Sequence, residues 1–172
     1  MLKLIGALLV IAGGIGMGFS YRQEMQDRLY HTKMLHRIIE LLESEIGYSK
    51  ATLPEACGNV ASRLPKPYID GLEKVREIMN SNRGLTFLLV WKQEMGRSLA
   101  DVNVGTREKD VFLNFPENKG YIDNIAQLKS FEKCKKELGK AIFAQEEKLE
   151  NKSKVVMSMG LIGGLFLTIV LL

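Results

Sequence analysis

Two histidines and two cysteines are the side chains of this sequence with the greatest potential for chemistry. His31 and His36 are five residues apart, a spacing that does not stack them on one face of a helix. A zinc-binding pair on a helix needs a separation of four residues and further histidine or carboxylate ligands within reach. We therefore predict no metal site, and we expect both histidines at the surface or at the edge of a domain.

The cysteines lack the neighbours of a catalytic thiol. Cys57 has no histidine close in sequence. Cys134 lies among lysines, whose positive charge can lower the pKa of a thiol, but we expect an unreactive thiol there as well. The sequence contains no phosphate-binding glycine loop, and no serine, histidine and aspartate set stands out. Glu146 and Glu147 lie in a mixed-charge stretch typical of a solvated helix face. We predict a protein that is not an enzyme and that uses no cofactor.

The elements around these residues include two segments without any charged residue, Leu4–Tyr21 and Val155–Leu172, each 18 residues long. At about 1.5 Å per residue, a helix of that length covers roughly 27 Å, close to the hydrocarbon thickness of a bilayer. We predict an N-terminal transmembrane helix within residues 1–21 and a C-terminal one within residues 155–172. A cleaved signal peptide is the alternative for the first segment.

Each predicted span holds two glycines that are one helical turn apart: Gly14 and Gly18 in the first, Gly160 and Gly164 in the second. Small residues at this spacing let helices approach closely in lipid. We predict that the four glycines pack the spans on each other or on a partner, against the alternative that glycine is simply common in membrane helices. Neither span contains an ionisable residue, so neither is predicted to conduct ions or protons.

Basic residues close to the spans indicate which side of the membrane the central part faces. Ten arginines and lysines flank the spans on the side of residues 22–154, against Lys3 alone on the other side. This bias predicts a cytoplasmic domain over residues 22–154, with both chain ends on the opposite face of the cell membrane. We therefore attribute the net charge of +4 to the basic residues that set the orientation in the membrane. Because aromatic and basic residues are not interleaved, this charge does not indicate nucleic-acid binding.

The central part has helical periodicity, and no two-residue alternation persists in it. The fold class is predicted to be all-α: a cytoplasmic helical bundle of about six helices, flanked by N- and C-terminal transmembrane helices. The predicted helices cover residues 22–46, 52–64, 68–79, 85–99, 106–115 and 122–154. The first of them carries an apolar stripe formed by Leu35, Ile38, Ile39, Leu42 and Ile46. The last carries a second one, interrupted by Lys135 and Gln145, formed by Leu128, Phe131, Leu138, Ile142 and Leu149.

The first predicted helix and the turn after it contain the candidate binding and structural residues. Thr52-Leu53-Pro54-Glu55 matches a capping box, and we expect Tyr48, Thr52 and Glu55 to order the turn. A basic face opposite the apolar stripe consists of Arg22, Lys33 and Arg37. This basic face would attract anionic lipid headgroups or an acidic protein partner, or it consists only of solvated charges that set the topology.

Several stretches resemble a known family. LESEIGY at residues 42–48 with TLPEA at 52–56, and FPENKG at 115–120 with MGLIGG at 159–164, resemble its conserved blocks. With MLKLIG at the start and a length of 172 residues, the chain resembles the stage III sporulation protein AB family.

The resemblance implies a subunit of the channel complex that joins mother cell and forespore during endospore formation, similar to the inner-membrane platform protein of type II secretion and type IV pilus systems. It implies a cytosolic secretion-type ATPase, the sporulation AA protein, and other channel subunits as partners, with the central domain on the mother-cell side. We expect Arg22, Lys33 and Arg37 to contact the ATPase and the spans to contact membrane lipid. Whether the chain forms homo-oligomers is left open. The alternative is a two-span receptor whose helical bundle senses a small external ligand, against which the charge bias argues.

Overall fold

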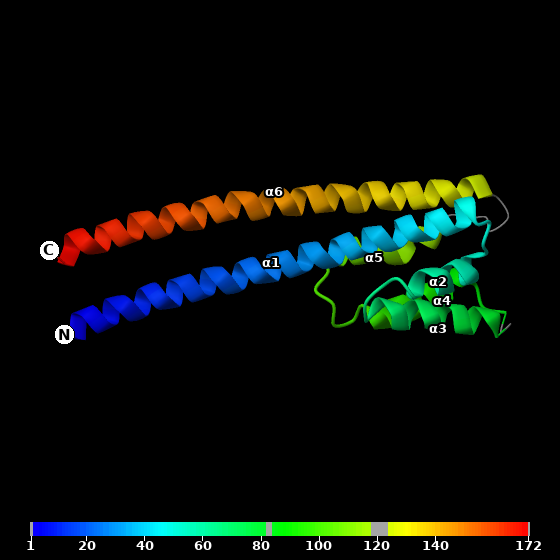
Figure 1. Cartoon of the computed structure of the whole chain (residues 1–172), viewed down its shortest axis with the longest axis horizontal. Coiled ribbons are helices and arrows are strands. Elements are labelled where there is room, and N and C mark those ends of the chain that lie inside the picture. The colour runs from blue at the N-terminus through cyan, green and yellow to red at the C-terminus, as the bar shows by residue number, and fades with distance from the viewer. Residues whose placement is uncertain (1, 82–83, 118–123, 172) are drawn as a thin grey trace. The chain divides into compact units, whose positions relative to one another are not determined.

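The computed structural model describes the backbone of residues 2–81, 84–117 and 124–171, and the side chains of residues 19–81, 84–116 and 128–151. Within these ranges the chain forms six α-helices, one short 3-10 helix and no strand (Figure 1). In chain order they are α1 (Leu2–Tyr48), α2 (Leu53–Ala61), α3 (Tyr68–Asn80), α4 (Phe87–Ser98), α5 (Thr106–Asn114), η1 (Phe115–Glu117) and α6 (Asn124–Leu171). The predicted all-α class is confirmed, and each predicted helix has a counterpart in the same order.

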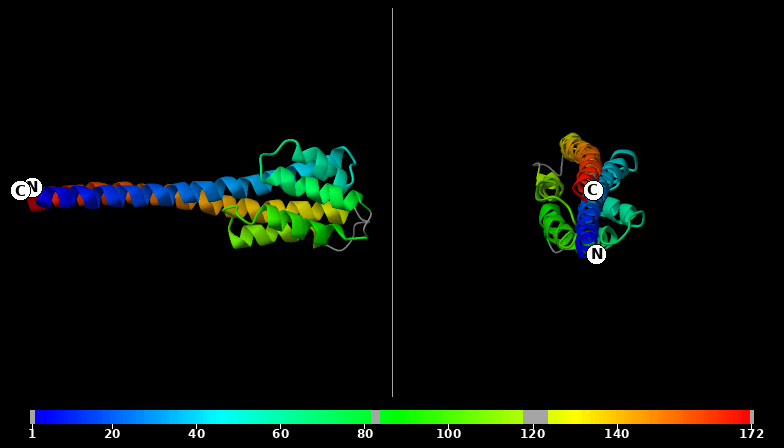
Figure 2. Two further views of the ribbon diagram at one scale, coloured as in Figure 1. Left: turned by 90° about the horizontal axis from the view of Figure 1, so that it is seen from below. Right: turned by 90° about the vertical axis from the view of Figure 1, so that its left-hand side faces the viewer.

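The chain forms two compact units, one of residues 1–29 with 143–172 and the other of residues 30–142. In the first unit the beginning of α1 and the end of α6 run antiparallel, so that these two helix ends lie at the same end of the unit (Figures 1 and 2). Among residues with described side chains, no helix is long and apolar enough to cross a membrane. Almost all of both predicted spans lies outside those residues, together with Gly14, Gly18, Gly160 and Gly164, so the spans and their packing stay predictions.

The second unit is a helical bundle in which α2 and α3 lie on one side and α4 and α5 on the other (Figure 2). Successive helices pack on one another, α2 on α3, α3 on α4 and α4 on α5. The apolar stripe predicted for the first helix is confirmed, because all five of its side chains are buried in the core. In the last helix Phe131 and Leu138 are buried as expected, whereas Leu128 is 37% exposed.

An aromatic cluster around Trp91 joins α4 to α5, η1 and α6. The Trp91 ring centre lies 5.6 Å from that of Phe87, 5.1 Å from Phe112 and 4.9 Å from Phe115. Phe115 in turn lies 5.0 Å from Phe131. The indole Nε1 of Trp91 donates a hydrogen bond of 3.1 Å to the backbone carbonyl of Phe112, which satisfies a polar group that is otherwise buried. The cluster fixes α5 and α6 on the same core.

The contact of α3 with α4 depends on a glycine. A Cβ atom added at Gly71 would lie 2.7 Å from Sδ of Met95 and 2.9 Å from Cβ of Ser98. Beside it, the Ser98 hydroxyl donates a hydrogen bond of 2.6 Å to the carbonyl of Pro67, just before α3. Because only a residue without a side chain allows this approach, Gly71 sets the spacing of the two helices.

Candidate functional site

The basic face predicted on the first helix is exposed at all three of its residues. Arg22 belongs to the first compact unit, and Lys33 and Arg37 belong to the second. Lys33 and Arg37 are four residues apart in α1, so their side chains are neighbours on one face of that helix. The helical bundle therefore presents these two cations together, and Arg22 is a residue of the other unit.

The turn from α1 to α2 contains the predicted capping box. The Glu55 carboxylate accepts hydrogen bonds of 2.9 Å from the backbone N–H of Thr52 and of 2.9 Å from its hydroxyl. Chiefly the backbone hydrogen bond, then the hydroxyl, lowers the pKa of Glu55 below its ordinary value of 4.5. Tyr48 ends α1 with its side chain 89% exposed, and no described contact holds it against the turn. Thr52 and Glu55 therefore cap α2 without Tyr48.

A second carboxylate, which the sequence analysis did not single out, orders the same turn. Glu45 is 8% exposed, and its carboxylate accepts hydrogen bonds of 3.0 Å each from Nδ2 of Asn59 and Nη2 of Arg63. Its backbone carbonyl also accepts a hydrogen bond of 3.1 Å from the N–H of Ser49. Helical spacing of three residues from Leu42 places Glu45 at the edge of the apolar stripe, and this position is the signal that would have identified it.

An ion pair joins α1 to α6. The Lys135 ammonium group contacts the Glu43 carboxylate, and both side chains are about three-quarters buried, with 27% and 26% exposed. Lys135 interrupts the apolar stripe of α6 in the sequence because its partner lies on another helix. Such a pair is worth more for alignment of the two helices than for stability, since its desolvation offsets much of its attraction.

The two histidines contact different partners. Nδ1 of His31 lies 2.7 Å from the hydroxyl of Tyr68 on α3, whereas Nδ1 of His36 lies 3.5 Å from a carboxylate oxygen of Glu40 on the same helix. His31 is thus part of the packing of α1 on α3. No group of three or more potential metal-binding side chains occurs among the residues that the structure describes.

Both cysteines are buried. Burial raises the pKa of the Cys57 thiol to about 12. The Sγ atom of Cys134 lies 3.7 Å from the carbonyl oxygen of Val111, and burial raises the pKa of this thiol to about 12 as well. The expectation of an unreactive thiol agrees with this burial, and the alternative of a pKa lowered by neighbouring lysines is not realised, because desolvation raises the pKa instead. Neither thiol is a nucleophile in this state.

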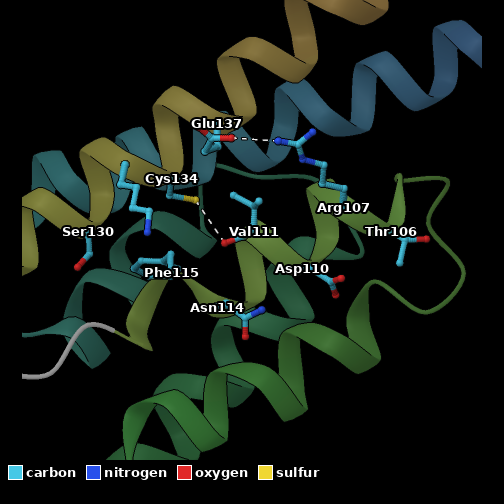
Figure 3. A pocket seen from close by; sticks show the side chains of 10 residues that line it. Thr106, Arg107, Asp110, Val111, Asn114, Phe115, Ser130, Cys134 and Glu137 are labelled. Atoms are coloured by element: carbon cyan, nitrogen blue, oxygen red, sulfur yellow. Dashed lines mark hydrogen bonds and ion pairs between the residues drawn. The ribbon is translucent and has the colours of Figure 1, made fainter.

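A pocket of about 600 Å³ lies between α5 and α6 in the helical bundle (Figure 3). Its inner part is apolar, with Val111, Phe115 and Cys134, and charged side chains from both helices surround it. Arg107 of α5 and Glu137 of α6 form an ion pair of 3.3 Å across it. The complete lining is Thr106, Arg107, Asp110, Val111, Asn114, Phe115, Ser130, Lys133, Cys134 and Glu137. The sequence analysis did not predict this α5–α6 pocket, because a local sequence pattern does not indicate which two helices will pack against each other.

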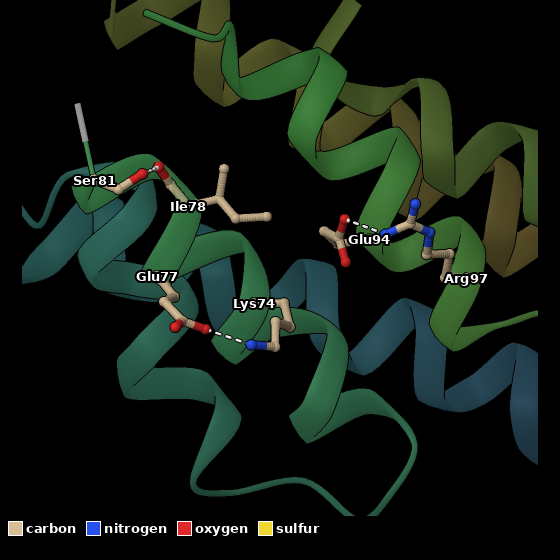
Figure 4. A network of polar contacts seen from close by, with 6 residues as sticks. All are labelled: Lys74, Glu77, Ile78, Ser81, Glu94 and Arg97. Atoms are coloured by element: carbon tan, nitrogen blue, oxygen red, sulfur yellow. Dashed lines mark hydrogen bonds and ion pairs between the residues drawn. The ribbon is translucent and has the colours of Figure 1, made fainter. Parts of the chain in front are cut away.

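Helices α3 and α4 each contain an ion pair between residues of the same helix (Figure 4). Lys74 pairs with Glu77 at 2.6 Å, and Arg97 pairs with Glu94 at 3.1 Å. The hydrogen bond that Lys74 donates to Glu77, the largest cause, raises the pKa of Lys74. Both pairs are local. The Lys74–Glu77 pair is exposed and contributes little to stability, whereas Glu94 is buried and Arg97 compensates its charge.

Comparison with known proteins gives the chain relatives over its whole length. The model of the stage III sporulation protein AB family matches residues 3–172. Stage III sporulation protein AB of Bacillus subtilis (strain 168) is 25% identical over 179 residues, and this alignment covers all of both proteins. A solved structure of a stage III sporulation protein AB has a TM-score of 0.64 at 20% identity, and covers 72% of this chain and 97% of that chain. At that identity the structural likeness shows a shared fold.

Proposed function

This chain belongs to the stage III sporulation protein AB family, and from that premise we propose that it is a non-enzymatic platform subunit of the membrane, which couples a cytosolic secretion-type ATPase to the channel complex required for endospore formation. Membership of the family implies a role in sporulation. The finer statement, that the role is to connect an ATPase with a channel, is the proposal. The partners it names are the sporulation AA protein and the other channel subunits.

One observation carries this proposal: the core of the helical bundle includes side chains of the same two helices that contain the predicted spans. α1 and α6 are 47 and 48 residues long, and each supplies buried side chains to the bundle. A helix that is only part of a small bundle has a length of about 11–12 residues on average. The extra length of α1 and α6 leaves room for two membrane anchors, and it supports a domain held at a membrane surface.

The second support is the kind of surface that the bundle presents. Lys33 and Arg37 are exposed neighbours on α1, while the polar side chains that are buried, such as Glu45, are engaged in contacts between helices. Exposed cations on a rigid helix attract an acidic protein surface and accelerate its association. We assign the ATPase contact to the basic face, with Lys33 and Arg37 in the bundle and Arg22 beside the first predicted span.

Co-purification of the full-length chain in detergent with the ATPase of the same organism tests this assignment. The double variant K33E/R37E should reduce the recovered ATPase several-fold, because it turns attraction into repulsion. The matched control K66E/K74E reverses two equally exposed lysines on and before α3 and should recover wild-type amounts. If wild-type chain recovers no ATPase, the coupling role is wrong. Equal recovery by K33E/R37E and wild type refutes only the contact surface.

A further inference from the structure

Three lysines form a row on the exposed side of α6. Lys129, Lys133 and Lys136 are spaced by four and three residues, which makes them neighbours on one helical face, and all three are exposed. The same stretch of helix buries Phe131 and Cys134 in the core, so the lysine row points away from the bundle. It extends over eight residues, or about 10 Å along the helix axis.

The lysine row differs from Lys135 and Lys140 of the same helix in having no ion pair among the described residues. Lys135 pairs with Glu43, and Lys140 pairs with Glu137 at 2.7 Å. Within the described part of the chain, no ion pair or hydrogen bond engages any of the three lysines of the row. These three adjacent cations form no ion pair with an acidic group among the described residues, although the exposed Glu132 lies on the same side of α6, and together they attract external negative charge.

The α5–α6 pocket opens directly beside the lysine row, because Lys133 also lines the pocket. Its inner wall is apolar, and its volume of about 600 Å³ lies within the range of roughly 300–1,000 Å³ in which proteins bind organic ligands. The site therefore combines an apolar recess with a row of cations along one edge.

The opposite edge of the pocket limits what can bind. Asp110 of α5 lies on this edge and adds one negative charge. Glu137 is already engaged by Lys140 and Arg107, and its pKa is lowered, chiefly by the hydrogen bond from Lys140. Because Glu137 on α6 and Arg107 on α5 neutralise each other, a ligand fits best with its negative charge beside the lysine row, apolar groups in the centre and no negative charge beside Asp110.

We infer that the lysine row and the α5–α6 pocket together dock an acidic amphipathic helix of the ATPase partner. Acidic side chains three and four residues apart on that helix match the spacing of Lys129, Lys133 and Lys136, and one or two apolar side chains of the same helix enter the pocket. A flat anionic membrane would meet the lysines but would leave the recess without an occupant. This inference rests on the proposed function, since it takes the ATPase as the partner, and it adds a contact surface separate from the basic face of α1.

The test is equilibrium binding of the purified ATPase to the full-length chain in nanodiscs of neutral lipid, at low and at high salt. The triple variant K129E/K133E/K136E should weaken binding at least about tenfold and reduce the salt dependence. The control K50E/K66E/K74E has the same change in net charge on other exposed lysines and should bind within about twofold of wild type. D110N removes the opposing negative charge and should strengthen binding about twofold.

A variant that fills the pocket tests the apolar half of the site. N114W places a large side chain at the half-buried lining position 114 and should weaken binding without changing its dependence on salt. Circular dichroism and thermal melts establish that each variant is folded, and a misfolded N114W is replaced by N114F. Co-sedimentation of the nanodiscs with anionic vesicles measures attraction to lipid.

The outcomes separate the two proposals. Wild-type affinity in the triple variant overturns the docking site and leaves the coupling role intact. Absence of ATPase binding by the wild-type chain overturns the coupling role and the docking site together. If the triple variant loses its binding to anionic vesicles but keeps its affinity for the ATPase, the lysine row is a lipid contact and the inference is wrong.

Discussion

The hydroxyl of Tyr68 and Nδ1 of His31 lie 2.7 Å apart and join the first long helix to α3. Tyr68 is fully buried, so its hydroxyl bonds to the protein instead of to water. His31, which was expected at the surface or at a domain edge, is partly buried and takes part in the contact between α1 and α3.

Replacement of Tyr68 by phenylalanine should destabilise the bundle by about 1 kcal/mol, because it removes the hydroxyl and keeps the ring. Chemical denaturation of the full-length chain in detergent, followed by far-ultraviolet circular dichroism, gives the difference. Y48F is the matched control, since Tyr48 is 89% exposed and loses only a solvated hydroxyl. Equal stability of Y68F and Y48F would show that the hydrogen bond contributes nothing.

Two glycines should respond in opposite directions to alanine. At Gly71 the new methyl group meets Met95 and Ser98, and the overpacking should cost about 1–3 kcal/mol. At Gly139, in the middle of α6, no atom lies within 4 Å of the new Cβ, so the gain in helix propensity should stabilise the chain by up to about 1 kcal/mol. Melting temperatures of G71A and G139A measured side by side test the pair, and a stabilised G71A would contradict the close approach of α3 and α4.

The capping box should make the start of α2 sensitive to acid. Hydrogen bonds from Thr52 lower the pKa of Glu55 in the folded chain below its ordinary value of 4.5. A lowered folded-state pKa means that the ionised carboxylate stabilises the folded state above the unfolded pKa, and that this contribution disappears as the pH falls through the folded pKa. E55Q should therefore be less stable than wild type near neutral pH, and the difference should shrink in acid. A pH-independent difference would show that the charge of Glu55 is not involved.

The two native thiols should not react with labelling reagents in the folded chain. Cys57 and Cys134 are buried with pKa values of about 12, so a thiol reagent should modify neither in the folded chain and both after denaturation. Labelling of Cys57 therefore cannot report which side of the membrane the bundle faces. An introduced cysteine at the exposed position 48 can, and the wild-type chain is its control. With a membrane-impermeant reagent, Y48C should react only after the cells are permeabilised; reaction in intact cells would place the bundle outside and favour the receptor alternative.

The sequence predicts those parts of the fold that depend on local pattern. The stripe from Leu35 to Ile46 is buried throughout, and α3 runs over Tyr68–Asn80 against a prediction of 68–79, because apolar period and turn residues are local signals. The partners across helices could not be predicted. Lys135 interrupts the apolar stripe of its helix in the sequence, and only the structure shows that its partner is Glu43 on α1.

In the candidate binding surface, too, the features that depend on local pattern could be predicted, and the contacts between helices could not. Exposure of Lys33 and Arg37 follows from their position opposite the apolar stripe of one helix. The α5–α6 pocket requires Val111 and Cys134, which are 23 residues apart in sequence, to face each other. That pairing is decided by the aromatic cluster around Trp91, in which rings from four separate elements fit together.

The contribution of both the first and the last helix to the bundle core also sets an order on biosynthesis. Phe131, Cys134 and Leu138 of α6 complete a core that the α1 stripe and the helices after it begin. The ribosome synthesises these three residues after residues 30–114. The apolar surface of α1 to α5 therefore stays exposed until α6 emerges. Over that interval the unfinished bundle is a substrate for chaperones, and a slower passage through the codons for residues 115–138 should lengthen its exposure.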